Sequence, residues 1–179
     1  MSDNIKTVCE QKNVKVHLRP IEMDDVGFLY DVENDQTIWD AGLTNVPYSQ
    51  GFLLEYILRC TCDIFTDKQV RLIVENEEGE PVGIIDLVNF EPAHCRAELG
   101  IIIKDEFRRR GYARAAVKQI LKYGKETVHL HQVYAIVAKT NEKCAKMLEQ
   151  VGFQRSMELK DWLYDGSAYH SAYFFQIFL

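Results

Sequence analysis

The sequence predicts a mixed α/β fold of the α+β kind, in which helices flank a mostly antiparallel, twisted sheet with one parallel strand pair. Three observations carry this prediction. Apolar residues alternate with polar ones in several runs, as they do in strands that bury one face. In other runs they recur every three or four positions, as in amphipathic helices. One strand–helix–strand unit needs a crossover connection, and such crossovers are right-handed and join parallel strands.

The first elements are a strand and two helices. Residues 14–20 (VKVHLRP) alternate like a strand and end at a proline. Residues 23–35 predict a short helix with acidic residues in its first turn, where the helix dipole favours them. A polar, turn-rich stretch follows at 36–49. Its last residue, Ser49, can cap a second helix whose apolar side is Leu53, Leu54, Ile57 and Leu58.

From residue 69 the hydrophobic period becomes that of strands. Residues 69–76 and 81–90 predict two strands joined by the turn EEGEP, and therefore a hairpin. Residues 95–103 (CRAELGIII) predict a third strand that ends near Lys104. The centre of the chain is therefore an antiparallel meander.

The remaining elements alternate helix and strand. The spacing becomes helical from Gly111, and 131–138 (HQVYAIVA) predicts a strand. The next helix is capped by Asn141 and stopped by Gly152. Two final strands meet at an Asp165–Gly166 turn. The order is β-α-α-β-β-β-α-β-α-β-β.

Composition indicates one domain over residues 14–179 after a flexible segment, 1–13. The 179 residues include no repeat, low-complexity tract or Gly/Ser linker. No apolar run approaches the roughly 18 residues that cross a bilayer, and the N-terminus has no signal-peptide core, so we expect a cytoplasmic protein with no membrane partner. The net charge of −6 argues against a nucleic-acid partner and mildly favours a cationic one. The five cysteines include no CxxC pair, so we expect reduced thiols and no metal.

Four arginines crowd around one glycine at the start of the central helix. They are Arg108, Arg109, Arg110 and Arg114, beside Gly111. A helix that begins there points its first N–H groups and its positive dipole end at the loop, and glycine lets a ligand approach the backbone. The loop therefore predicts a phosphate or pyrophosphate site, with a solvated basic turn as the alternative. Neither a Walker P-loop (GxxxxGK[ST]) nor a GxGxxG motif is present.

Three segments carry a family resemblance. They are RRRGYA at 108–113, AELGIII at 97–103 and NEKCAKMLEQVGF at 141–153. Together they resemble the R/Q-x-x-G-x-G/A loop, the central strand and the N-x-x-(A/S)-x-x-x-(Y/L)-x-x-x-G-F helix of the GCN5-related N-acetyltransferase (GNAT) superfamily. The predicted order of elements is also that of the GNAT fold. The resemblance covers residues 14–179 and implies an enzyme, an acetyl-CoA-dependent N-acetyltransferase.

The resemblance also implies a cofactor site. The anion would be the pyrophosphate of acetyl-CoA, the co-substrate, held by backbone amides of residues 109–114. The edge formed by Ile101, Ile102 and Ile103 would pair with the pantetheine arm, as an added strand would. Asn141 would reach the pantetheine or the acyl end, besides capping its helix. The full cofactor-binding set is then Ile101, Ile102, Ile103, Arg108, Arg109, Arg110, Gly111, Tyr112, Ala113, Arg114 and Asn141.

In the implied reaction, a free amine attacks the thioester carbonyl. An alkylamine with a pKa of about 10.4 is protonated at neutral pH, so the site must remove a proton. Glu98 is the first candidate base because it precedes the strand residues expected to carry the thioester, and Asp86 on the neighbouring strand is the second. An outward-facing side chain or a structural ion pair is the alternative for each. Leu148 stands where many family members carry a tyrosine acid, so the sequence predicts no acid.

The acceptor amine is the least determined feature. Three strand segments are similar to spermidine and diamine N-acetyltransferases, whereas Leu148 is similar to the ribosomal-protein N-terminal acetyltransferases. Asn45 and Asn89 stand where polyamine enzymes carry glutamates, which weakens the case for a polycation or a regulatory site. We expect a small-molecule amine such as spermidine or another polyamine first, a protein N-terminus second and an antibiotic amine third. A non-catalytic acetyl-CoA-binding module is the alternative of another class, and homo-oligomers are compatible with the fold.

Overall fold

The computed structural model describes residues 14–35, 46–61 and 63–179. In this part of the chain seven strands form one sheet in the order β1-β2-β3-β4-β5-β7-β6. Only the β4–β5 pair is parallel, which confirms the predicted mixed sheet. The strands are β1 (His17–Pro20), β2 (Val70–Glu75), β3 (Pro81–Glu91), β4 (Arg96–Ile103), β5 (Gln132–Ala138), β6 (Gln154–Tyr164) and β7 (Tyr169–Phe178).

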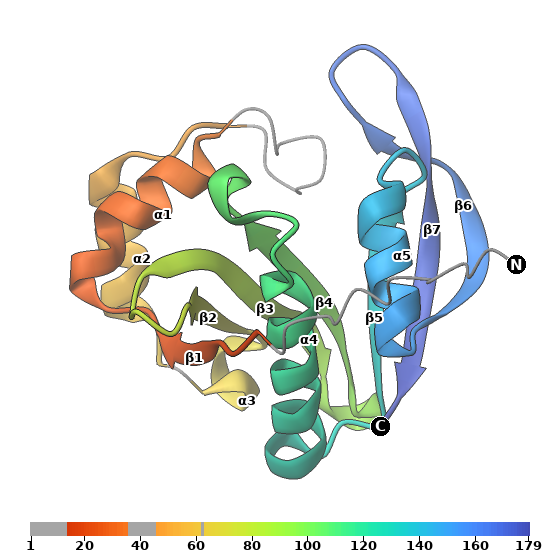
Figure 1. Cartoon of the computed structure of the whole chain (residues 1–179), viewed down its shortest axis with the longest axis horizontal. Coiled ribbons are helices and arrows are strands. Elements are labelled where there is room, and N and C mark those ends of the chain that lie inside the picture. The colour runs from red at the N-terminus through yellow and green to blue at the C-terminus, as the bar shows by residue number, and fades with distance from the viewer. Residues whose placement is uncertain (1–13, 36–45, 62) are drawn as a thin grey trace, which may run out of the picture.

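The four predicted helices form, and shorter ones join them (Figure 1). The α-helices are α1 (Val26–Glu33), α2 (Gln50–Arg59), α3 (Ile64–Asp67), α4 (Tyr112–Tyr123) and α5 (Glu142–Val151). The tighter or wider turns are η1 (Met23–Asp25), η3 (Pro92–His94), η4 (Asp105–Phe107) and the π-helical η5 (Gly124–Val128). The helix predicted at 23–35 forms as η1 followed by α1, whereas the sequence did not predict α3, η3, η4 or η5, and β1 is shorter than the strand predicted at 14–20. The segment 1–13, Asn45 and most of the turn-rich stretch 36–49 lie outside the described residues.

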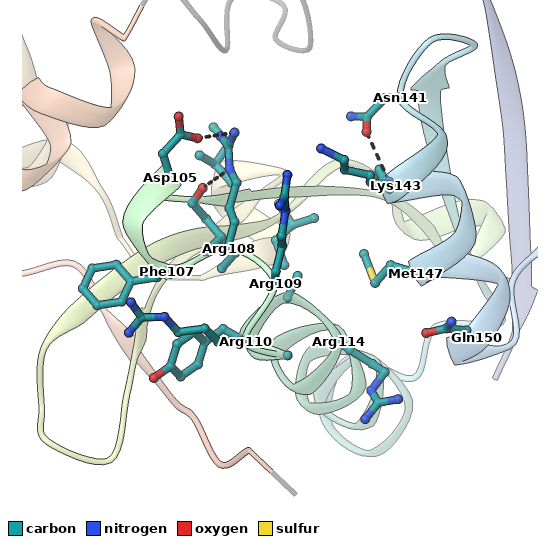
Figure 2. Close-up of a pocket in the computed structure, with 17 residues that line it drawn as sticks. Asp105, Phe107, Arg108, Arg109, Arg110, Arg114, Asn141, Lys143, Met147 and Gln150 are labelled. Carbon is teal, nitrogen blue, oxygen red and sulfur yellow. Dashed lines mark hydrogen bonds and ion pairs between the residues drawn. The ribbon is translucent and has the colours of Figure 1, made fainter. Parts of the chain in front are cut away.

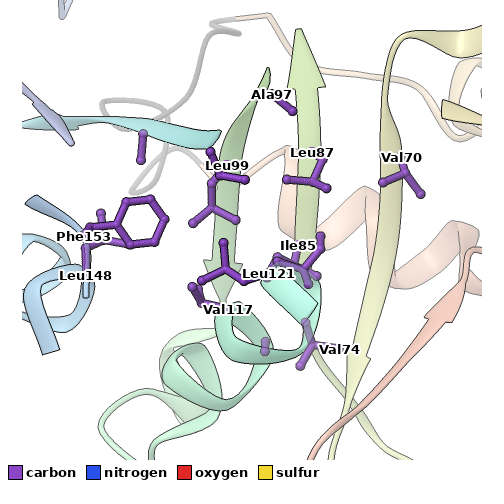
Figure 3. Packing of buried hydrophobic residues seen from close by; sticks show 14 of the residues in the cluster. Val70, Val74, Ile85, Leu87, Ala97, Leu99, Val117, Leu121, Leu148 and Phe153 are labelled. Atoms are coloured by element: carbon purple, nitrogen blue, oxygen red, sulfur yellow. The ribbon is translucent and has the colours of Figure 1, made fainter. Parts of the chain in front are cut away.

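Each face of the sheet carries its own hydrophobic cluster. Consecutive strand residues point to opposite faces, so Ile73 and Ile84 pack with α1 and α2 while Val74 and Ile85 pack on the other side. The second, larger cluster joins the sheet to α4 and α5. Figure 3 shows its centre, where Val117 and other α4 residues meet the side chains of the central strands. We call the two sides the α1/α2 face and the α4/α5 face.

The parallel pair is short, and this shapes the site. Pairing between β4 and β5 runs from Arg96 opposite Gln132 only as far as Glu98 opposite Tyr134. Both strands continue beyond that point, β4 to Ile103 and β5 to Ala138, so they diverge. We call this point of divergence the fork. It leaves the β5-facing edge of β4 without β5 pairing from Leu99 onward.

A substitution at Leu148 tests which face of α5 is packed in the core. Its side chain is 1% exposed inside the larger cluster, so Leu148→Phe adds volume to a packed core and should cost about 1–3 kcal/mol of unfolding free energy. Thermal and denaturant unfolding would measure this loss. Leu58→Phe is the matched control, because Leu58 on α2 is 66% exposed. Full stability with reduced turnover would show that residue 148 acts in the site instead.

Candidate active site

Two residues of the loop between β4 and α4 have a left-handed backbone conformation. After η4, Arg109 has φ 64° and Gly111 has φ 95°, so two left-handed residues lie within three positions. Alternating left-handed residues in a turn form a concave cradle of N–H groups that suits an anion. Gly111 is the N-cap of the twelve-residue helix α4, whose dipole adds positive potential there. This local geometry favours the phosphate-site prediction over a plain basic turn.

The loop borders a cavity of about 1050 Å³ between α4, α5 and the end of β4. Figure 2 shows its lining side chains. The lining residues are Ile101, Ile102, Ile103, Asp105, Phe107, Arg108, Arg109, Arg110, Gly111, Tyr112, Ala113, Arg114, Asn141, Lys143, Cys144, Met147 and Gln150. The fold therefore brings every residue of the predicted cofactor-binding set to this one cavity. Contact of each residue with acetyl-CoA stays a prediction.

The arginines of the loop have different local partners. Arg108 donates from Nε to the Ile103 carbonyl at 2.8 Å and also pairs with Asp105. The guanidinium of Arg110 lies 5.4 Å from the centre of the Phe107 ring. Clustered positive charges repel one another. These contacts hold the Arg108 and Arg110 side chains against different partners, which keeps their charges apart. In Figure 2, Arg109 and Lys143 extend toward the space between the loop and α5.

Helix α5 supplies most of the lining residues that the sequence did not predict, and Asp105 and Phe107 of η4 are the others. Lys143, Met147 and Gln150 line the cavity from the side of α5 that adjoins its buried stripe. Their spacing of four and three residues was the signal that could have identified them. Cys144 also lines the cavity, and burial raises the pKa of its thiol to about 11, so it stays protonated at neutral pH. Asn141 caps the helix, accepting from the Cys144 N–H at 3.1 Å, and lines the cavity as well.

The two candidate bases lie outside the cavity, on the α1/α2 face. Arg71 of β2 donates to both oxygens of Asp86 at 3.0 Å and also pairs with Glu33 at the end of α1. Burial raises the pKa of the Asp86 carboxyl, and the Arg71 charge opposes that change. The ion pair favours the structural alternative for Asp86, and its role as a base stays a prediction.

Glu98 is the carboxylate at the fork. It is half-buried, and it is the last β4 residue that pairs with β5. One of its oxygens accepts from the Asn89 side-chain amide at 2.8 Å. Tyr134 lies opposite Glu98 on β5, and the charge of Glu98 is, after burial, one cause of the raised pKa of the Tyr134 hydroxyl. Glu98 thus lies where the sheet opens, on the face away from α4 and α5.

Two absences hold for the described residues. Among them no group of three or more His, Cys, Asp or Glu side chains could hold a metal ion. In the same part of the chain, no helix is both long and apolar enough to span a bilayer.

Comparison with known proteins gives consistent matches. The family model "Acetyltransferase (GNAT) domain" matches residues 15–154. Spermidine N(1)-acetyltransferase of Escherichia coli (strain K12) is 30% identical over 88% of this chain and 82% of its own length. A putative ribosomal N-acetyltransferase of Bacillus subtilis is 29% identical over 56% of this chain and 55% of its own.

Solved structures of the spermidine N-acetyltransferase from Vibrio cholerae also match. The complex with CoA and spermine superimposes with a TM-score of 0.80 at 26% identity, covering 92% of this chain and 95% of that chain. A dodecameric structure of the same enzyme matches with a TM-score of 0.77 at 25% identity, covering 92% and 94%.

Proposed function

This chain belongs to the GNAT acetyltransferase family and is an acetyl-CoA-dependent N-acetyltransferase, and from this premise we propose that its acceptor is a polyamine such as spermidine. The observation that carries the proposal is the fork. It opens the sheet between a cavity on the α4/α5 face and a carboxylate, Glu98, on the α1/α2 face. Acetyl-CoA would occupy the cavity, and the amine would approach Glu98 from the opposite face.

The cavity residues would hold and orient the donor. The N–H cradle at Arg109–Gly111 would bind the pyrophosphate, and the exposed edge of β4 at Ile101–Ile103 would pair with the pantetheine. Backbone N–H groups on that edge would also polarise the thioester carbonyl as an oxyanion hole does. The thioester would then lie at the fork.

Glu98 would act as the base. The ammonium proton of the acceptor passes to the Glu98 carboxylate directly or through water, and the freed nitrogen forms the new C–N bond. The C–S bond then breaks with the electron pair on sulfur, and the second nitrogen proton passes to the departing thiolate or to solvent. A coenzyme A thiolate, with a pKa of about 8.5 like that of cysteine, can leave without a protein acid. This suits Leu148, which is packed in the core where a tyrosine would otherwise stand.

Charge on the α1/α2 face supports a cationic acceptor. Glu33, Asp86 and Glu98 lie on this side of the sheet, and Arg71 offsets one of their negative charges. The whole chain carries a net charge of −6. A polyamine is the cationic amine that the 30% identical Escherichia coli relative is named for. Asn89, at 2.8 Å from Glu98, adds no charge of its own.

The direct test is release of free thiol from acetyl-CoA with a panel of acceptors. We expect turnover with spermidine, spermine or putrescine, and none with short N-terminal peptides or an aminoglycoside. Turnover with peptides alone would instead support a protein N-terminal acetyltransferase, which the partial match to the ribosomal enzyme favours. Bound acetyl-CoA without turnover of any acceptor would support the non-catalytic module.

Self-association is a further part of the proposal. The related Vibrio cholerae enzyme has a dodecameric structure. Light scattering on the purified chain would give a mass above one protomer if this chain also forms a homo-oligomer.

A further inference from the structure

We propose that Tyr134 and Asn89 are positioning residues that hold the Glu98 carboxylate at the fork in the orientation needed to take the proton of the acceptor amine. The inference rests on the proposed role of Glu98. It assigns roles to two residues that neither line the cavity nor belong to the predicted cofactor-binding set.

The three side chains come from three neighbouring strands. Tyr134 on β5 and Glu98 on β4 are the last residue pair before the fork opens. Asn89 lies on β3 at the irregularity between Val88 and Glu91, where the β3–β4 register shifts. Their strand neighbours, such as Ala97 and Val133, pack in the α4/α5 cluster, so Glu98 and Tyr134 point to the α1/α2 face.

Asn89 is held in an unusual conformation that suits this contact. Its φ is 50°, in the left-handed region that few non-glycine residues occupy and that asparagine tolerates better than most. The bulge aims its side-chain amide at Glu98, and Nδ2 donates to Oε2 at 2.8 Å. Bulges next to functional sites often redirect one side chain in this way.

Tyr134 is held from its other side. Its ring stacks on Phe174 of β7, with ring centres 5.2 Å apart and planes 17° apart. Burial, and after it the charge of Glu98, raises the pKa of the Tyr134 hydroxyl, so it stays a donor at neutral pH. The Asn89 hydrogen bond from β3 and the stacked Tyr134 side chain opposite on β5 limit how the Glu98 carboxylate can rotate, and a base must lie within hydrogen-bond reach of the proton that it takes.

The test compares Tyr134→Phe and Asn89→Gly with and without Glu98→Gln. Phenylalanine keeps the stack on Phe174, and glycine accepts the left-handed backbone, so Tyr134→Phe removes only the hydroxyl and Asn89→Gly removes the hydrogen bond to Glu98. We expect each single variant to lower kcat roughly tenfold with the KM for acetyl-CoA unchanged, since each removes one polar group beside the charged Glu98 carboxylate. In the Glu98→Gln background, neither should lower kcat further.

Two matched control variants make the same kinds of change, loss of a tyrosine hydroxyl and relaxation of a left-handed residue, at other places in the molecule. Tyr164→Phe deletes a hydroxyl that donates to the Gly166 carbonyl on the β6–β7 hairpin. Asp161→Gly relaxes another left-handed residue, with φ 48°, at an irregularity of β6. Both should keep wild-type kcat.

The possible results separate the two proposals. Normal kcat in Tyr134→Phe and Asn89→Gly, with Glu98→Gln impaired, would overturn the positioning role and leave Glu98 as the base. Undiminished effects in the Glu98→Gln background would overturn it too, because the residues would then act independently. Normal kcat in Glu98→Gln would remove the base itself. Independently of any acceptor, the ¹³C signal of the Tyr134 ring should move in Glu98→Gln, and an unmoved signal would refute the contact.

Discussion

Replacing Gly111 with valine should reduce the affinity for coenzyme A on the order of a hundredfold or more. Gly111 has φ 95°, and a Cβ there would meet Val14 Cγ2 at 3.3 Å. A β-branched residue cannot adopt this conformation without strain, so the loop must shift and the N–H cradle must open. Losing two N–H contacts to a charged phosphate is worth roughly 3 kcal/mol or more, which gives the expected loss. Titration calorimetry with coenzyme A would measure it.

The β6–β7 hairpin offers a matched control. Gly166 has the same φ of 95°, and nothing lies within 4 Å of a Cβ built there. Gly166→Val therefore imposes the same kind of backbone strain away from the cavity and should leave coenzyme A affinity intact. Retained affinity in Gly111→Val, with a folded protein, would contradict the phosphate-site assignment.

The parts of the fold that the sequence predicted well are those with strong periodicity. The helical spacing after Gly111 predicts one apolar face, and all of its members except the half-buried Ala113 are buried: Ala116, Val117, Ile120 and Leu121 in α4 and Gly124 at the start of η5. Helix α5 likewise begins after its Asn141 cap and ends at Gly152, which is left-handed at φ 116°. Local signals sufficed here because cap, stripe and stop lie within one short segment.

The elements that the sequence missed are short or irregular. Helix α3 is a single turn capped by the Asp63 side chain, and the π-helical turn η5 only extends the end of α4. Neither is long enough to show a hydrophobic period. The bulge at Asn89 depends on how β3 and β4 pair, which no local pattern reveals.

The residues of the candidate site also differ in how well the sequence could predict them. The cavity residues of the loop and β4 are contiguous in sequence, so one motif and one resemblance could name them together. The fork residues are not contiguous, because Glu98 meets Tyr134 only through the register of a parallel pair joined by a helical crossover. Likewise, the sequence placed Asp86 near the site but could not show that Arg71 pairs with it.

Glu98→Gln should lower kcat by about two to four orders of magnitude, the usual contribution of a general base. Glutamine has the same shape, and its oxygen can still accept from Asn89, so the fold and the fork should persist. The affinity for acetyl-CoA should not change, because Glu98 does not line the cavity. Steady-state thiol release with the preferred acceptor, together with calorimetry for acetyl-CoA, would separate these two quantities.

Substitutions of two further carboxylates test whether the loss of kcat is specific to Glu98. Glu91→Gln removes a carboxylate on the same strand pair that is 45% exposed and paired with Arg96, and it should retain wild-type kcat. Asp86→Asn should lower the unfolding free energy first, because Arg71 would lose a buried anionic partner. If Asp86→Asn instead abolished turnover in a fully stable protein while Glu98→Gln remained active, the base would be Asp86, and the amine would approach the sheet over β3 and not at the fork.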